Sequence, residues 1–127
     1  MKKLLFIILL LLLISCSGKN SYQKFCQIEN SIYDNPKLSR KIVDSLQKTC
    51  DSTDETKMMY LRYLHFLLDD KLYVTHTNIP EIQEMVDFFE KSKDRRMLGR
   101  AFYALGRVAS DLFWIKVLGE FSWWELY

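Results

Sequence analysis

The sequence predicts an all-α protein, and two observations carry that prediction. The chain of 127 residues holds only four Gly and two Pro, too few for a turn-rich all-β fold. Apolar residues recur at spacings of three and four along most of the chain, which is the period of a helix with one buried face. Because 49% of the residues are hydrophobic, a disordered chain is also excluded. We expect antiparallel helical hairpins.

Length and charge exclude several function classes. A chain of 127 residues allows one small domain and excludes βαβ barrels and two-domain enzymes. Its 18 Lys plus Arg and 16 Asp plus Glu give a net charge of +2, far from the strong basic excess typical of nucleic-acid binders. We therefore expect no nucleic-acid partner.

The first residues are typical of a signal peptide. Lys2 and Lys3 precede an unbroken apolar run over residues 4–14. A membrane-spanning helix needs about 20 apolar residues, so this run is too short to span a bilayer. We expect residues 1–15 to be a cleaved signal peptide, whose two lysines account for the basic surplus.

The segment Leu13-Ile14-Ser15-Cys16 resembles the lipobox of bacterial lipoproteins. The resemblance implies cleavage before Cys16, a covalent diacylglycerol on its thiol and further acylation, for example with palmitate, as lipid anchor. Two or three acyl chains suffice for stable membrane anchoring. Ser17 in place of Asp implies sorting to the outer membrane, facing the periplasm. An ordinary cleaved signal, with Cys16 coincidental, is the alternative.

The first two expected helices form a hairpin after a short tether, residues 16–21. Residues 22–33 place Tyr22, Phe25, Ile28 and Ile32 on one face. Asn35 and Pro36 are a favoured cap and first residue for a second helix, with an apolar stripe of Leu38, Ile42, Val43 and Leu46.

Two cysteines remain in this hairpin, Cys26 and Cys50. An exported compartment permits a disulfide between them. Their expected offset of roughly 9 Å along the hairpin exceeds the reach of about 7 Å that a disulfide allows between Cα atoms. Free thiols are the favoured interpretation, and a disulfide is the alternative.

The next helix is expected to lie between neighbours. Ser52 and Glu55 have the spacing of a capping box, and the helix that they open runs to about Asp70. It is apolar on most sides, with one narrow polar stripe of Arg62, His65 and Asp69, which is typical of a sandwiched helix.

Two more helices follow a loop over residues 71–77. We expect Asn78 to cap the first of these helices and the side chain of Glu81 to reach back to the N–H of Asn78. The expected core face of this helix holds Ile82, Met85, Val86 and Phe89, and its solvent face holds Glu84, Asp87 and Lys91. Asp94 caps a helix that runs from residue 95 to about residue 112. Its expected apolar stripe is Leu98, Ala101, Phe102, Leu105, Val108 and Leu112.

The segment GRAFYALGRVASD, residues 99–111, resembles the first helix of a tetratricopeptide repeat. The matching positions are Phe102, Leu105, Gly106 and Ala109, and Gly106 is expected to let a partner helix approach closely. Over residues 1–112 the order of features resembles the N-terminal part of Bacteroidetes repeat lipoproteins. The resemblance implies a TPR-like α-solenoid fragment over residues 22–112.

Residues 113–127 depart from the repeat pattern and form an atypical aromatic tail. Leu118, Ser122 and Glu125 stand where a repeat carries Ala, an aromatic residue and Ala. The tail holds all three Trp. Two interpretations are open: a truncated or frame-shifted gene that stops within a repeat, and a capping or membrane-interface helix, since Trp and Tyr favour the headgroup zone.

The only residues suggestive of function form a stripe: Arg100, Tyr103, Arg107 and Asp111. By resemblance they line the concave groove of a repeat array, which Arg62 extends. A Tyr between two Arg suits a peptide carboxylate or acidic segment of a protein partner. The alternative is a solvated face with an Arg107–Asp111 pair.

No catalytic constellation is present. His65 and His76 lack the spacing of a metal motif, so we expect no enzyme, no metal and no cofactor beyond the acyl lipid on Cys16. The sequence predicts a lipid-anchored cell-envelope lipoprotein with a TPR-like protein-binding scaffold. The alternative is a truncated periplasmic sensor fragment of a TPR-containing signalling or regulatory protein.

Overall fold

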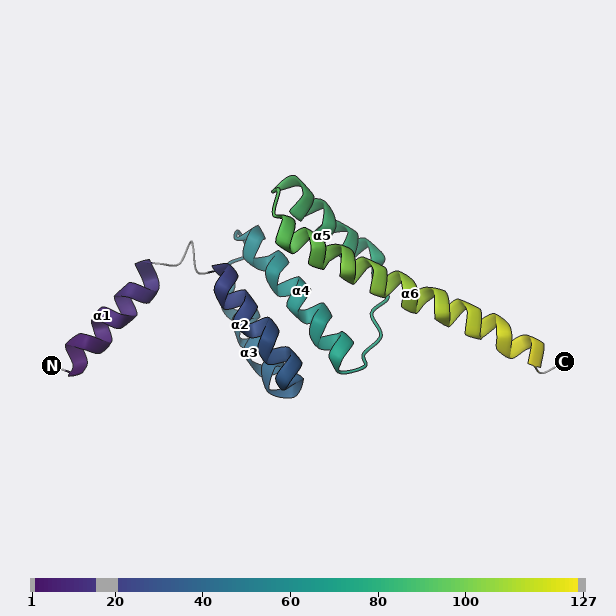
Figure 1. Ribbon diagram of the computed structural model, residues 1–127, viewed down its shortest axis with the longest axis horizontal. Coiled ribbons are helices and arrows are strands. Elements are labelled where there is room, and N and C mark those ends of the chain that lie inside the picture. Colours follow the sequence, from purple (N-terminus) through teal and green to yellow (C-terminus); the bar gives the residue numbers. More distant parts are fainter. Residues whose placement is uncertain (1, 16–20, 126–127) are drawn as a thin grey trace.

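The computed structural model describes residues 2–15 and 21–125, and every regular element in these ranges is a helix (Figure 1). The prediction of an all-α fold is confirmed. The helices are α1 (Lys2–Ser15), α2 (Ser21–Asp34), α3 (Pro36–Thr49), α4 (Glu55–Lys71), α5 (Ile79–Lys91) and α6 (Arg95–Glu125). Cys16 and most of the expected tether, residues 16–20, lie outside the described residues.

Helix α1 stands apart from the other helices and packs against none of them within the described residues (Figure 1). The side chains of residues 4–8 are exposed. In the described part of the chain, no helix combines the length and the apolar character needed to cross a membrane.

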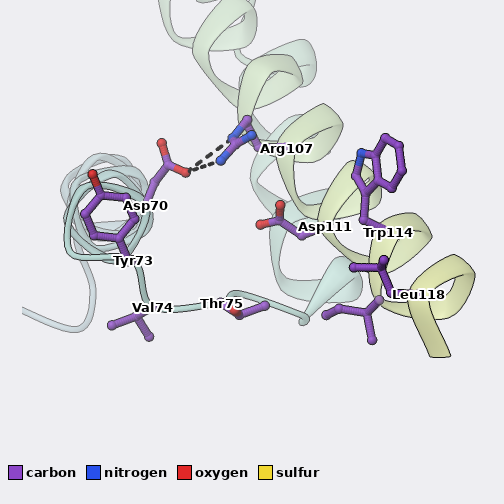
Figure 2. A pocket seen from close by; sticks show the side chains of 9 residues that line it. Asp70, Tyr73, Val74, Thr75, Arg107, Asp111, Trp114 and Leu118 are labelled. Carbon is purple, nitrogen blue, oxygen red and sulfur yellow. Dashed lines mark hydrogen bonds and ion pairs between the residues drawn. The ribbon is translucent and has the colours of Figure 1, made fainter. Parts of the chain in front are cut away.

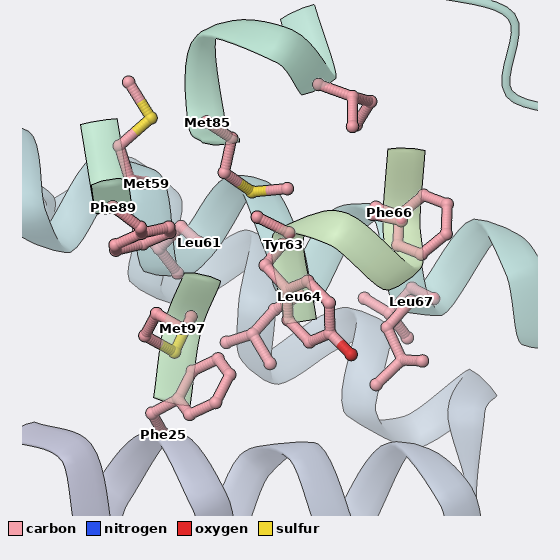
Figure 3. Close-up of a cluster of buried hydrophobic side chains, with 14 of the residues drawn as sticks. Phe25, Met59, Leu61, Tyr63, Leu64, Phe66, Leu67, Met85, Phe89 and Met97 are labelled. Atoms are coloured by element: carbon pink, nitrogen blue, oxygen red, sulfur yellow. The ribbon is translucent and has the colours of Figure 1, made fainter. Parts of the chain in front are cut away.

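Helix α4 lies at the centre of the fold and packs against α2, α3, α5 and α6. Seven of its side chains are buried, and they meet residues of α2, α5 and α6 in one hydrophobic cluster (Figure 3). The predicted sandwiched helix is confirmed. The inward face predicted for α5 is also confirmed, because Ile82, Met85, Val86 and Phe89 are all buried.

Three predicted helix caps are present. The side-chain oxygens of Asn35, Asn78 and Asp94 each accept a hydrogen bond from the backbone N–H three residues later, at 3.2, 3.1 and 3.2 Å. Such bonds satisfy N–H groups that a helix leaves unpaired at its start.

The predicted capping box of Ser52 and Glu55 is wrong. Asp54 is the cap, and its carboxylate accepts from the N–H of Lys57 at 3.1 Å. Asp51 folds the preceding residues into a turn, accepting the N–H of Thr53 at 3.0 Å on its carboxylate and that of Asp54 at 3.0 Å on its carbonyl. This turn leaves Ser52 outside the helix.

The buried stripe of α3 differs from the predicted one. Of the four predicted residues, Val43 is buried and Leu46 is partly buried, whereas Leu38 and Ile42 are 55% and 43% exposed. Ser39, which the prediction leaves out, is buried. The hydroxyl of Ser39 donates to the hydroxyl of Ser31 on α2 at 2.9 Å. This bond satisfies the buried hydroxyl group of Ser39.

Helix α6 differs from the prediction in length and in register. It continues to Glu125, and no Pro interrupts the sequence after Asp111. The predicted residues Ala101 and Val108 are fully buried, but so are Met97 and Ala104, which the prediction leaves out, whereas Phe102 is 53% exposed. Leu98, Leu105 and Leu112 are partly buried against the core.

The close approach predicted at Gly106 is absent from the described residues. A Cβ placed on Gly106, or on Gly99, would meet no atom within 4 Å. The reason is the register of α6, since both glycines lie on the face opposite the buried stripe.

Cys26 and Cys50 are both free thiols, each half-buried. The disulfide alternative is therefore not formed in this structure.

Candidate protein-binding groove along α6

Two adjoining hollows follow one face of α6, and we call them together the α6 groove. The first, about 410 Å³, lies between α6 and the helices α2 and α4. The second, about 270 Å³, lies between α6 and the loop after α4. Four predicted site residues, Arg100, Tyr103, Arg107 and Asp111, line this groove. Their spacing of three and four residues places them on one side of the helix.

Arg100 joins α6 to α2 within the first hollow. Its Nε and Nη2 donate to the two carboxylate oxygens of Glu29 at 2.7 and 2.9 Å. Its Nη1 donates to the hydroxyl of Tyr22 at 3.0 Å and to the carbonyl of Arg96 at 3.2 Å. The remaining Nη2 contact is with the sulfur of Cys26 at 4.0 Å.

All five N–H groups of the Arg100 guanidinium therefore have intramolecular partners. The hydrogen bond to Glu29 is the main cause that raises the pKa of Arg100 above its usual value. Only 22% of the Arg100 side chain and 13% of the Glu29 side chain are exposed. This geometry gives Arg100 a positioning role between α2 and α6 and leaves it no N–H for an incoming acidic segment.

Arg107 occupies the second hollow and pairs with Asp70 of α4 (Figure 2). Its Nη2 and Nε donate to the same carboxylate oxygen at 2.8 and 3.2 Å. Asp70 is thus the hydrogen-bonded partner of Arg107, in place of the predicted Asp111 four residues along the helix. The hydrogen bond to Asp70, followed by the charge of Asp70, raises the pKa of Arg107. The Arg107 side chain is 44% exposed, and three of its five N–H groups bond to no other described residue.

The second hollow continues onto apolar side chains of α6. Trp114, Ile115 and Leu118 are 57%, 52% and 63% exposed and line the hollow together with Val74 of the loop (Figure 2). An exposed apolar patch bordered by charged groups is typical of a protein-interaction surface.

Tyr103 lies between the two arginines, as predicted. It is 45% exposed, and its ring contacts the edge of Phe66 at 6.3 Å between ring centroids. It therefore presents a partly fixed aromatic surface to the groove.

Arg62 does not extend the groove. It lies on the side of α4 that faces α5, where its Nη1 donates to the carbonyl of Glu81 at 3.3 Å and lies 3.3 Å from the carboxylate of Glu84. The sequence reasoning placed Arg62 by analogy with a repeat array, and its actual neighbours come from α5.

Sequence reasoning missed the two carboxylates of the groove, Glu29 and Asp70. Glu29 is 71 residues from Arg100, and Asp70 is 37 residues from Arg107, so spacing along one helix gives no sign of either pair. The available signal was weaker: Asp70 lies in the last turn of α4, which buries seven side chains, and an unpaired carboxylate next to such a core is costly.

Other polar clusters give no metal site. Among the described residues, no group of three or more His, Cys, Asp or Glu side chains could hold a metal ion. The Nε2 of His76 lies 3.8 Å from the carboxylate of Asp69, and that carboxylate also accepts from Arg40 at 2.9 Å. His65 is half-buried on α4.

Two tyrosines of α4 predict how stability changes at alkaline pH. Burial, followed by the charge of Asp94, raises the pKa of Tyr60 to about 12, and burial also raises the pKa of Tyr63. The unfolded chain releases these protons near pH 10, about the ordinary tyrosine pKa. The contribution of these two groups to stability is therefore constant below about pH 10 and falls as the pH rises from there towards about 12.

Urea unfolding at increasing pH tests this, with tyrosinate absorbance followed in parallel. Tyr60→Phe should lose less stability between neutral and alkaline pH than the unaltered chain does. The exposed Tyr73, replaced by Phe, is the matched control and should leave the pH profile unchanged. Equal alkaline losses in all three proteins would contradict the assignment.

No protein-family model matches this chain, and no curated protein or solved structure is significantly similar to it.

Proposed function

We propose that this protein is a lipid-anchored, non-enzymatic scaffold of the bacterial cell envelope that binds a segment of a partner protein in the second hollow of the α6 groove. One observation carries the proposal. The exposed side chains of Trp114, Ile115 and Leu118 adjoin an arginine that keeps free N–H donors. Apolar contact area with a few directed polar groups is the usual composition of a binding site for a protein segment.

The chemistry of the hollow indicates the kind of segment. Arg107 offers N–H donors to a carboxylate or a backbone carbonyl, and the Asp111 carboxylate accepts no hydrogen bond from another described residue. A partner that places apolar side chains on Trp114 and Leu118 can also pair its polar groups with these two residues. Because Asp70 already neutralises part of the Arg107 charge, a strongly acidic segment is less favoured than a mixed one.

The order of packing supports a repeat-like scaffold. Among helices α2 to α6, each helix packs against the next, and α4 also packs against α2 and α6. Alternate helices thus line one side, as they do in α-solenoids built from helical hairpins. The extended α6 reaches beyond α5 (Figure 1) and provides the apolar part of the groove.

The lipid anchor is tested by replacing Cys16 with Ala in the full chain and fractionating cells. We expect the protein to leave the membrane fraction and to lose its acyl label. Ser15→Ala keeps a small residue before the cysteine and serves as the control. Unchanged membrane association of the Cys16→Ala protein would contradict the anchor.

The groove is tested by quantitative mass spectrometry of proteins crosslinked in cells to the tagged full chain. The test variant combines Arg107→Glu with Leu118→Asp, and the control variant combines Lys37→Glu with Lys41→Glu on the exposed side of α3. We expect the test variant to lose a specific partner by about tenfold or more, since each 1.4 kcal/mol of lost binding is tenfold. Identical partner sets for the two variants would contradict the proposal.

A further inference from the structure

A second, separate crevice lies between the first turns of α2 and α4. Its volume is about 530 Å³, within the range of about 300–1,000 Å³ typical of small-molecule sites. We call it the α2–α4 crevice. Its lining residues are Ser21, Lys24, Phe25 and Ile28 of α2, Leu46 of α3, the cap residue Asp54, and Thr56, Lys57, Tyr60, Leu61 and Leu64 of α4.

The floor of the crevice is apolar. Phe25, Leu61 and Leu64 are only 2%, 3% and 2% exposed, and Ile28 and Leu46 are partly buried against the same core. None of these side chains can form a hydrogen bond, and the backbone groups of the helix interiors are paired within the helices. A peptide laid on this floor would leave its own amide groups unpaired, which is costly, whereas an alkyl chain would not.

The mouth of the crevice is positive. Lys24 and Lys57 are exposed and form no ion pair with another described residue. Both lie in the first turn of their helices, where the helix dipole disfavours a cation. The carboxylate of Asp54 also lies at the mouth, and it accepts the N–H of Lys57 as a helix cap. A bound anion between the two ammonium groups would offset the unfavourable placement of both lysines.

We propose that the α2–α4 crevice binds a long-chain fatty acid, with the alkyl chain on the apolar floor and the carboxylate between Lys24 and Lys57. This site is separate from the α6 groove, and the proposal does not depend on the proposed function. It adds a small-molecule ligand of defined chemistry, an anionic single-chain amphiphile, to a protein otherwise argued to bind protein segments.

The test uses the full chain in nanodiscs of neutral phosphatidylcholine and a palmitate analogue that carries a photoactivatable diazirine at the end of the chain. After irradiation, mass spectrometry locates the labelled peptides. We expect labels on residues 21–28 and 54–64, and an excess of palmitate without the diazirine should reduce this labelling by competing with the probe.

Three variants make the test specific. Lys24→Glu with Lys57→Glu should reduce labelling about tenfold, as expected for loss of two charge-assisted contacts, and Lys37→Glu with Lys41→Glu should leave it unchanged. Ile28→Trp fills the crevice and should reduce labelling with both lysines present. Circular dichroism checks that each variant remains helical.

Several results would overturn the proposal. One is labelling centred on α6 or spread evenly over the chain. Another is labelling of the Lys24→Glu and Lys57→Glu double variant that equals labelling of the unaltered chain. A third is labelling by the uncharged methyl ester of the probe that equals labelling by the free acid. Competition by nanodiscs containing phosphatidylglycerol, without competition by palmitate, would assign the crevice to a membrane phospholipid instead.

Discussion

Replacement of Met97 by Ala should lower the free energy of unfolding by about 2–5 kcal/mol, the range for truncating a buried Met. Replacement of Phe102 by Ala should lower it by less than about 1 kcal/mol, as for a surface position. Met97 is fully buried and Phe102 is 53% exposed, although the larger, aromatic side chain belongs to Phe102. Urea unfolding of the two variants, followed by circular dichroism, measures both values.

Both substitutions introduce Ala, the strongest helix former, so lost helix propensity cannot explain a loss of stability in either variant. Ala104→Ser provides a further check, since it places a hydroxyl on the buried stripe of α6 and should also destabilise. If Phe102→Ala cost as much as Met97→Ala, the register of α6 described above would be wrong.

Removal of either partner of the Arg100–Glu29 pair should lower the free energy of unfolding by about 2–3 kcal/mol. The reason is that a largely buried charge would lose its partner, and hydrogen bonds to charged groups contribute about 1.5–3 kcal/mol. The variants are Arg100→Met and Glu29→Gln, which keep the approximate shapes of the side chains. The double variant should cost clearly less than the two single losses added together, with a coupling of about 1–3 kcal/mol.

The matched control is the exposed pair formed by Gln83 and Asp87 on α5, whose side chains are 3.0 Å apart. Its coupling should be only about 0.2–0.5 kcal/mol, the usual value for exposed neighbours on a helix. A coupling of the same small size for Arg100 and Glu29 would contradict the positioning role of Arg100. Arg100 would then be available to bind a partner in the groove.

The helix order and several helix starts could be predicted from the sequence because they depend on local chemistry. Asn35, Asn78 and Asp94 cap their helices through bonds to the third residue after them. The burial of α4 follows from its nearly continuous apolar surface. In both cases the cause lies within a few turns of the same helix.

The register of α6 was predicted only in part. Ala101 and Val108 belong to the predicted stripe and are buried, but hydrophobicity alone also places Phe102 inside. In the structure Ala104 joins Ala101 on the buried face of α6, which packs against α4 and α5. Small side chains at a contact let helix axes approach closely, since the distance between packed helices depends on the residues between them. Packing against the neighbouring helices therefore determines whether the face with large apolar side chains or the face with small ones is buried.

The groove was predicted in part. Tyr103, Arg107 and Asp111 line it as the spacing indicated, but the partners of its arginines come from other helices. Glu29 and Asp70 change the groove from a basic surface into one that is largely neutralised. Tertiary ion pairs of this kind are set by packing, which no single-helix pattern contains.

The most direct test of the central claim, that α6 binds a partner protein, is site-specific photo-crosslinking in living cells. A photoreactive amino acid replaces Ile115 in the groove, and in a second strain it replaces the exposed Ile42 on α3. We predict a discrete heavier product at position 115 that is absent at position 42 and is lost when Arg107→Glu is added. No discrete product at position 115, or the same product at both positions, would contradict a binding groove along α6.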